Sequence, residues 1–387
     1  MRVFAADSLL LKLIGLTICN HLVLCAMRVT LVLNALKGGA SAIAVGVLIS
    51  CFALLPMFFS VAIGRRVDRN PRRPMLLGSC GVLVSALLPL LSSALPVLFL
   101  SALLCGLAFS TFSIASQKVT GEIGPVSRRA HNYSLLAVGN SFSVFAGPLV
   151  AGFAIDHFGF NTVFLILLFL PAIPIAVLAR RKLELPQPQT FSSAPGSAFD
   201  LWRLPELRTL LLINVLISGS WDVHAILVPV YGHQIGFSAS EIGVVLAAFG
   251  IATFAVRLVM PFIIRRFAET QVLKTALIVS GVLYLLFPFL DSVALLSALS
   301  FALGCALGSG QPMVLALLHT HAPRGRTGEA VGLRLALLQG SSVTVPVAFG
   351  GLGASVGIWP VLWVCATVLI GGHRLVTKFQ KIRRKEM

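Results

Sequence analysis

The sequence predicts an all-α integral membrane protein with twelve transmembrane helices, arranged as two pseudo-symmetric bundles of six. Hydrophobic residues make up 57% of the chain and charged residues only 11%, a balance that a water-soluble domain could not bury. Apolar runs of about twenty residues recur along the chain, and each is long enough to cross the hydrocarbon core of a bilayer. Basic residues gather between alternate runs, which is the positive-inside pattern.

The apolar runs divide the chain into four regions. Residues 1–179 are expected to form an N-terminal six-helix bundle, with spans at 9–35, 42–63, 75–93, 96–118, 131–156 and 161–179. Residues 180–207 form a cytoplasmic linker, because Pro186, Pro188 and Pro195 lie in its polar middle. Residues 208–376 form the C-terminal bundle, with spans at 208–232, 240–264, 271–290, 293–319, 328–354 and 358–376. Residues 377–387 form a basic cytoplasmic tail.

The placement of charge indicates orientation rather than a nucleic-acid partner. The net charge is +17, but most basic residues lie in alternate loops and at the termini, and Lys37 lies in the opposite set of loops. The protein is therefore expected in the cell (inner) membrane, with both termini in the cytoplasm. The chain shows no cleavage signal before its first apolar run, which we interpret as an uncleaved span. The seven cysteines lie inside apolar runs without metal-ligand spacing, so no metal and no cofactor are expected.

The two halves repeat each other. A shift of 198 residues aligns Pro125–Gly159 with Pro323–Gly357 without a gap, and the shared residues are mostly Pro, Gly and Arg, which shape the backbone and loops. Parallel halves of this kind are typical of rocker-type transporters, although two membrane hairpins can also resemble each other by coincidence.

The loop Gly64–Arg73 carries the most specific motif. Gly64 allows two helices to approach closely, and Asp68 can accept hydrogen bonds from arginines or from a helix N-terminus. Arg69, Arg72 and Arg73 can reach carboxylates or lipid phosphates. The spacing G-x-x-x-D-R-x-x-R-R resembles the loop signature of the major facilitator superfamily of secondary transporters. This resemblance implies a cytoplasmic latch that holds the two halves together when the protein faces outward. Pro71 stands where that family usually has glycine, and the counterpart at Arg265 and Arg266 lacks the acid.

The fifth span carries a second motif, formed by Gly139, Ser143, Gly147, Pro148 and Gly152. Small residues four apart line one helix face, and the proline kinks the helix. The pattern resembles the antiporter motif of the same superfamily, and the alternative is ordinary helix packing.

The chain looks most similar to the drug:proton antiporter type, with one departure in the fourth span. Many such exporters carry an arginine there, four residues before a glycine, whereas Ala102 holds that position before Gly106. Any proton coupling must therefore lie elsewhere.

Charged residues inside the expected spans need a reason, because each costs at least about 2.5–3.5 kcal/mol at the bilayer centre. Asp222 is the one carboxylate expected near mid-membrane, and we interpret it as the residue that couples protons or contacts substrate. Arg28 is its expected partner by resemblance, since the first and seventh spans face each other in the superfamily. The alternative is a static salt bridge or gate between the halves.

Further polar residues in the spans are expected to line the substrate cavity. Gln311 lies in Gly308–Pro312, where we expect the tenth span to be unwound or kinked. The other candidates are Asn20, His21, His224, Asn140 and Arg334. Glu329 is interpreted as structural, paired with Arg326 or with the cytoplasmic arginines.

These features predict a monomeric secondary active transporter that moves a small organic solute by alternating access. Proton-coupled export is the first hypothesis. Import or facilitated passage of an organic anion is the alternative, suggested by three arginines within the spans against one central carboxylate. A non-transporting polytopic membrane protein is the remote one. The sequence has no H-E-x-x-H or P-loop pattern, so we expect no enzyme; protons and membrane lipid are the expected partners besides the substrate.

Overall fold

The structure is a computed structural model that describes residues 2–40, 42–180, 183, 185, 198–237, 239–356 and 358–386. The three prolines of the expected linker, Pro186, Pro188 and Pro195, lie outside the described residues. The described residues are almost entirely helical and contain no strand. An all-helical chain is what a bilayer requires, because a helix satisfies its own backbone polar groups within each segment.

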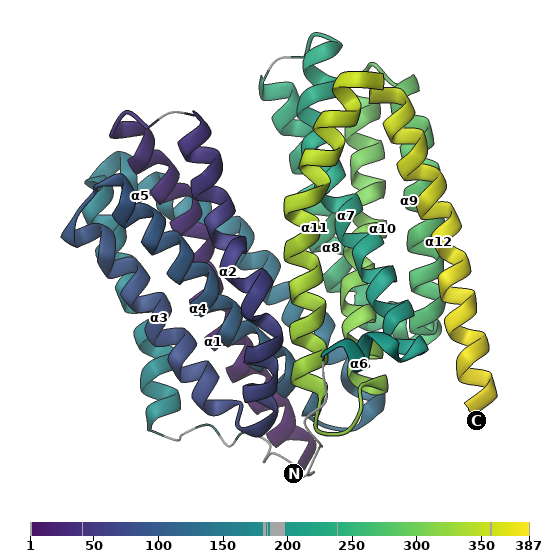
Figure 1. Ribbon diagram of the computed structural model, residues 1–387, viewed down its shortest axis with the longest axis horizontal. Helices are drawn as coiled ribbons and strands as arrows, with labels where there is room; N and C mark the ends of the chain where they lie inside the picture. Colours follow the sequence, from purple (N-terminus) through teal and green to yellow (C-terminus); the bar gives the residue numbers. More distant parts are fainter. Residues whose placement is uncertain are drawn as a thin grey trace. The chain divides into compact units, whose positions relative to one another are not determined.

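Apart from residues 180–197, most of which lie outside the described residues, the helices follow one another with short connections (Figure 1). In chain order they are α1 (Arg2–Lys37), α2 (Ala42–Arg69), α3 (Arg72–Leu91), α4 (Leu95–Glu122), η1 (Val126–Arg128), α5 (Arg129–Ala179), α6 (Ala198–Arg203), α7 (Pro205–Gln234), α8 (Ala239–Arg266), α9 (Glu269–Leu286), η2 (Phe287–Phe289), α10 (Val293–His321), α11 (Thr327–Val356) and α12 (Ile358–Glu386).

Helix α5 contains both the fifth and the sixth expected spans. The two are separated at Gly159, where φ is 78° and ψ is 171°. A side chain at this backbone conformation would be strained, so glycine makes the break possible. At the other end of the chain, α12 runs without interruption through the expected basic tail to Glu386.

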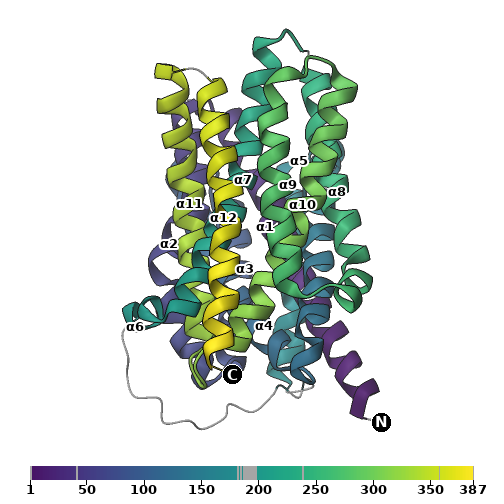
Figure 2. The ribbon, with the colours of Figure 1, turned by 90° about the vertical axis from the view of Figure 1, so that its right-hand side faces the viewer.

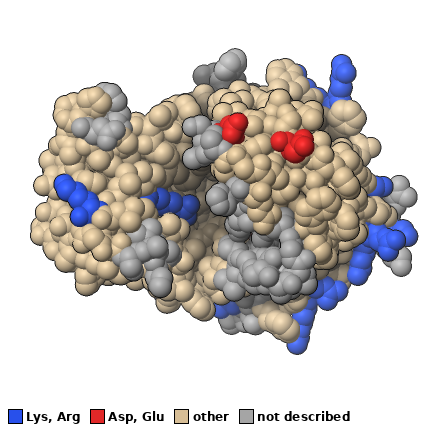
Figure 3. All heavy atoms as spheres, turned by 90° about the horizontal axis from the view of Figure 1, so that it is seen from above, with Lys and Arg blue, Asp and Glu red and all other residues tan. Residues whose placement is uncertain are grey.

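Nine helices among the described residues are long and apolar enough to cross a membrane. They are Ser8–Lys37, Val47–Arg69, Arg72–Leu91, Leu95–Glu122, Val126–Gly152, His157–Ala179, Val244–Arg266, Glu269–Phe289 and Val293–His321. Their surfaces suit lipid: Leu77 is 69% exposed and Phe169 is 74% exposed. Figure 3 is seen from above, toward the ends of the helices, and the described residues on that face are also mostly uncharged. The chain is therefore a multi-pass membrane protein.

The helices form two compact units. Unit 1 comprises Met1–Ala198 together with Ala322–Gln339, and unit 2 comprises Phe199–His321 together with Gly340–Met387. Helix α11 is thus divided, since its first turns pack with unit 1 and the remainder with unit 2.

Each unit is held by its own helix contacts. In unit 1, α1 packs along α5, and α4 contacts both α2 and α3. A core of fully buried apolar residues, including Met27, Phe52 and Phe164, lies among these helices. In unit 2, α10 lies between α8 and α9 (Figures 1 and 2), and α12 packs on α9 and α7.

Candidate latch and transport site

The carboxylate of Asp68 binds the N-terminus of α11. Its Oδ1 accepts a hydrogen bond from the backbone N–H of Gly328 at 2.6 Å, and its Oδ2 accepts one from Glu329 at 2.9 Å. These two N–H groups belong to the first turn of α11, where the backbone donors have no intrahelical acceptor. The positive end of the helix dipole also favours a carboxylate there. The sequence left arginines or a helix N-terminus as donors to Asp68, and in the structure the donors are backbone N–H groups at a helix N-terminus.

Glycines let α2 and α11 touch backbone to backbone. A Cβ on Gly64 would lie 2.1 Å from the carbonyl oxygen of Gly328. One turn further along, a Cβ on Gly332 would lie 2.2 Å from the carbonyl oxygen of Ser60. Any side chain at either glycine would push the helices apart, so Asp68 reaches the first turn of α11 only because Gly64 lacks one.

Glu329 holds two arginines beside this contact. The glutamate side chain is 4% exposed; its Oε1 accepts from Nε of Arg65 at 2.9 Å and its Oε2 from Nε of Arg326 at 2.7 Å. Glu329 thus pairs both with Arg326 and with an arginine of the loop Gly64–Arg73, the two kinds of partner expected for it from the sequence. Arg65 itself was not given a role, although it lies one turn before Asp68 on the same helix and so shares its face.

The remaining arginines of the loop lie elsewhere. Arg72 donates to the carbonyl oxygens of Leu178, at 3.1 Å, and of Leu183, and so ties the loop to the end of α5. Arg69 and Arg73 are exposed. The structure therefore brings Gly64 and Asp68 onto α11 and places Arg69, Arg72 and Arg73 outside that contact.

A polar network at the end of α4 continues the cluster within unit 1. Lys118 pairs with Glu122 at 2.6 Å, and the hydroxyl of Tyr133 donates to the carbonyl oxygen of Gln117 at 2.8 Å. Arg334, expected in the substrate cavity, is only 3% exposed and interacts electrostatically with Tyr133.

The small residues of the fifth span pack on α1. A Cβ on Gly139 would lie 2.8 Å from Cγ2 of Ile14, and one on Gly147 would lie 2.6 Å from Cβ of Cys25. The hydroxyl of Ser143, fully buried beside α1, donates to the carbonyl oxygen of Gly139 at 3.2 Å. Pro148 lies half-buried within α5. A Cβ on Gly152 would meet no atom within 4 Å among the described residues, so Gly152 takes no part in this packing.

The polar candidates on α1 and α5 lie among the helices of unit 1. Asn20 is fully buried, and its Nδ2 donates to Oγ of Ser79 on α3 at 3.0 Å. The ring of His21 stacks on Phe109 of α4, with 4.9 Å between ring centroids. Asn140 is half-buried, and its Oδ1 has no hydrogen-bond partner among the described residues.

Asp222 lies half-buried on α7, and its Oδ2 accepts a hydrogen bond from Oγ of Ser342 on α11 at 3.1 Å. Both residues belong to unit 2. Arg28 belongs to unit 1, where its guanidinium lies 5.5 Å from the ring centroid of Phe52. The pairing of Arg28 with Asp222 stays a prediction.

Aromatic rings surround the neighbours of Asp222. His224 is 1% exposed; its Nε2 lies 3.1 Å from Oγ of Ser300, and its ring stacks on Phe249 at 4.2 Å. Trp221 meets the same Phe249 edge-on at 4.8 Å, and the guanidinium of Arg257 lies 5.6 Å from the Trp221 ring centroid. His224 is thus part of the packing between helices. Trp221, which directly precedes Asp222, was not singled out from the sequence.

The tenth span was expected to be unwound or kinked near Gln311, and the unwinding is wrong. Helix α10 is continuous from Val293 to His321. Its glycines serve close packing instead: a Cβ on Gly304 would lie 2.5 Å from the carbonyl oxygen of Phe249, and one on Gly308 would lie 3.1 Å from Cα of Thr253. Gln311 is half-buried, and its Nε2 lies 3.4 Å from Oγ of Ser218 on α7.

Comparison with known proteins gives consistent results. Residues 15–219 and 210–385 match the family model described as Major Facilitator Superfamily. The chain is 25% identical over 337 residues to the tetracycline resistance protein, class G, of Vibrio anguillarum, covering 84% of each chain. It is 24% identical over 334 residues to the multidrug resistance protein MdtG of Dickeya zeae (strain Ech586), covering 84% of this chain and 81% of the other. A solved bacterial homologue of the iron transporter ferroportin, in an outward-facing state, has the same fold with a TM-score of 0.82 at 15% identity, covering 97% of this chain and 99% of that one.

Proposed function

The chain belongs to the major facilitator superfamily and is a membrane transporter, and we propose that it exports a small organic solute in exchange for protons. The observation that carries the proposal is Asp222. This carboxylate lies half-buried on α7, and within unit 2 it accepts its hydrogen bond from the neutral hydroxyl of Ser342. A carboxylate at membrane depth is expensive while ionised, so binding a proton relieves the cost.

The relatives support the class of solute and the direction. The names of two relatives state resistance to tetracycline and to several drugs, and a membrane transporter gives such resistance by removing an organic compound from the cell. A proton gradient directed into the cell can drive such removal when one carboxylate binds proton and solute in turn. Asp222 is the residue to which we assign this exchange.

The contact between α2 and the start of α11 is the proposed cytoplasmic latch. Asp68 binds the first turn of α11, and Glu329 holds Arg65 and Arg326 beside it. While the latch is formed, the cytoplasmic side is closed. When the latch breaks, the start of α11 is free to move. Alternating access then follows from breaking and remaking this contact in each cycle.

The proposed architecture has twelve spans in two six-helix bundles, residues 1–179 and 208–376, with a linker at 180–207 and a tail at 377–387. It has both termini in the cytoplasm, lies in the inner membrane and works as a monomer. The repeat of Pro125–Gly159 in Pro323–Gly357 supports the two halves. The assignment of Ala322–Gln339 to unit 1 by contacts follows from the latch, which draws the start of α11 onto α2.

Entry of an organic anion is the second candidate, favoured by two arginines within the helices, of which Arg334 is buried and Arg257 half-buried. Arg334 is 3% exposed, and Arg257 lies over Trp221 one residue from the central carboxylate. In that case Asp222 has a structural role and its charge is not needed for transport.

Purified protein in liposomes with an internal pH dye separates the two functions. Drug cations and organic anions are added in turn to wild type, Asp222→Asn and Asp222→Glu. Antiport predicts compound-dependent proton movement that Asp222→Asn abolishes and Asp222→Glu retains in part. Asp291→Asn, which changes an exposed carboxylate after η2, is the matched control and should transport normally. Anion uptake that persists in Asp222→Asn without proton movement would replace the first proposal by the second.

A further inference from the structure

Unit 1 has a groove on its side, between α2 and α3. Its volume is about 270 Å³, and α4 forms its floor through Leu104, Leu107, Ala108 and Thr111. Helices α2 and α3 form the walls, through residues that include Phe59 and Leu77. Phe59 is 50% exposed and Leu77 is 69% exposed, so the groove opens sideways, onto the outer surface of the helices.

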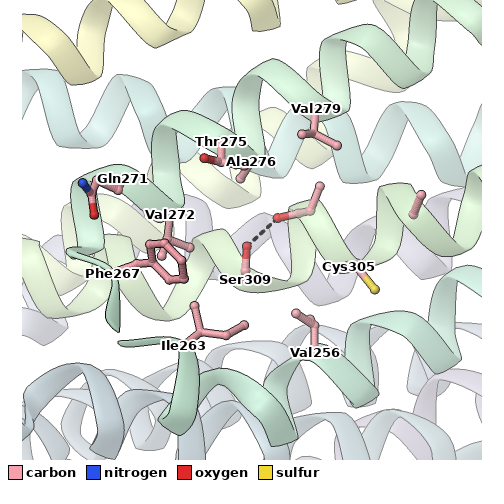
Figure 4. A pocket seen from close by; sticks show the side chains of 12 residues that line it. Val256, Ile263, Phe267, Gln271, Val272, Thr275, Ala276, Val279, Cys305 and Ser309 are labelled. Atoms are coloured by element: carbon pink, nitrogen blue, oxygen red, sulfur yellow. Dashed lines mark hydrogen bonds between the residues drawn. The ribbon is translucent and has the colours of Figure 1, made fainter. Parts of the chain in front are cut away.

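Unit 2 has a corresponding groove between α8 and α9, with a volume of about 410 Å³. Figure 4 shows Val256 and Ile263 on one wall, Thr275 and Val279 on the other, and Ser309 between them. The floor is formed by Ala302, Cys305, Ala306 and Ser309 of α10.

The two grooves occupy the same positions of the repeated halves. Each floor residue of the second groove lies 198 residues after one of the first, so Leu104 corresponds to Ala302 and Thr111 to Ser309. The same offset relates the α3 wall to the α9 wall, for example Leu77 to Thr275. It is also the offset that aligns Pro125–Gly159 with Pro323–Gly357. The groove is therefore a feature of the repeat and not a local packing defect.

The walls and floor lie in segments that can cross a membrane, Val47–Arg69, Arg72–Leu91 and Leu95–Glu122 in unit 1 and Val244–Arg266, Glu269–Phe289 and Val293–His321 in unit 2. A sideways-opening apolar groove at this depth faces lipid chains, because the bilayer core contains no other medium.

The grooves differ in charge at the end near the α2–α3 loop. Arg66 lines the first groove there and is exposed. The corresponding position on α8, 197 residues later, is Ile263, which lines the second groove. A guanidinium forms paired hydrogen bonds with a phosphate, which isoleucine cannot do.

We propose that the groove of unit 1 is a binding site for an anionic glycerophospholipid. One acyl chain lies on the floor formed by α4, and the headgroup phosphate binds Arg66. The groove of unit 2 takes an acyl chain without selecting the headgroup. The proposal does not depend on what the protein transports or in which direction.

Native mass spectrometry of the full chain, released from detergent after titration with phosphatidylglycerol or phosphatidylcholine, tests the site. Wild type should retain one phosphatidylglycerol in preference to phosphatidylcholine. Arg66→Ile should reduce that preference by about fivefold, the effect of one basic residue near an anionic lipid. Arg66→Lys should keep most of it. Ile263→Arg should add a second retained phosphatidylglycerol, because it gives the second groove the charge of the first.

Two further variants separate the groove from general surface charge. Thr111→Phe fills the floor and should reduce retention of the selected lipid with Arg66 intact. Arg69→Gln removes a charge of the same loop that does not line the groove, and should change the preference less than Arg66→Ile does. Equal losses in Arg69→Gln and Arg66→Ile, or an unchanged preference in Arg66→Ile, would overturn the proposal.

Discussion

Replacing Asp68 with alanine removes both acceptors from the first turn of α11. The wild-type carboxylate accepts from the N–H groups of Gly328 and Glu329 at 2.6 and 2.9 Å. Hydrogen bonds to a charged group each contribute about 1.5–3 kcal/mol. Water can reach part of this site, so the lower end applies, and we expect the contact to weaken by about 2–4 kcal/mol. A loss of about 2 kcal/mol corresponds to a factor of about 30 in the opening equilibrium.

Hydrogen–deuterium exchange of peptides that cover residues 322–339 measures this opening. In Asp68→Ala the amides at the start of α11 should exchange about 30-fold faster or more. Asp68→Asn keeps one acceptor oxygen and should lie between the alanine variant and wild type. Arg69→Ala changes the adjacent exposed residue and should leave the peptides as in wild type. Unchanged exchange in Asp68→Ala would refute the claim that this carboxylate holds the start of α11.

The other contacts of the latch give two more predictions. Gly64→Ala places a Cβ 2.1 Å from the carbonyl oxygen of Gly328 and should lower stability by about 1–3 kcal/mol. Gly15→Ala on α1, whose Cβ would meet no atom within 4 Å among the described residues, should be neutral or stabilising. Thermal unfolding in detergent compares the two variants, and equal midpoints would contradict the close approach. Glu329→Gln removes the charge that holds Arg65 and Arg326 and should lower the free energy of unfolding by about 1–3 kcal/mol, measured in the same assay. The expected loss is kept small because Arg65 is half-exposed, so water screens its ion pair. If Arg65→Gln adds as much loss on top of Glu329→Gln as it causes alone, the two side chains are not coupled.

The α2 side of the proposed latch could be predicted from the sequence, because Gly64 and Asp68 lie one turn apart and match the loop signature of the superfamily. The glycine indicates a close helix, and the aspartate left two kinds of donor open, arginines or a helix N-terminus. The identity of that helix could not be predicted in the same way. It is set by Gly328 and Gly332, whose value for close approach appears only when Ser60 and Gly64 are beside them.

The cavity residues could not be selected from the sequence, and the physical reason is the solvent. A helix in lipid is apolar all round, so the pattern of polar and apolar residues does not tell which face points inward. Asn20 and His224 were both candidates to line the substrate cavity; each is fully buried against a serine of a neighbouring helix, and their place in the cavity stays a prediction. The glycines of α10 were misread for a similar reason, since close packing and unwinding both favour glycine.

The division of α11 at Gln339 has a mechanical consequence. Helix α11 is continuous from Thr327 to Val356, but its first part packs with unit 1 and its second part with unit 2. The first residues beyond the division are Gly340, Ser341 and Ser342, and no atom of the described residues lies within 4 Å of a Cβ position on Gly340. Glycine–serine pairs are among the few places where helices bend sharply. A displacement of one unit against the other therefore either bends α11 at Gly340–Ser342 or pulls its first turn away from Asp68. Ser342, whose hydroxyl binds Asp222, belongs to the segment that would bend.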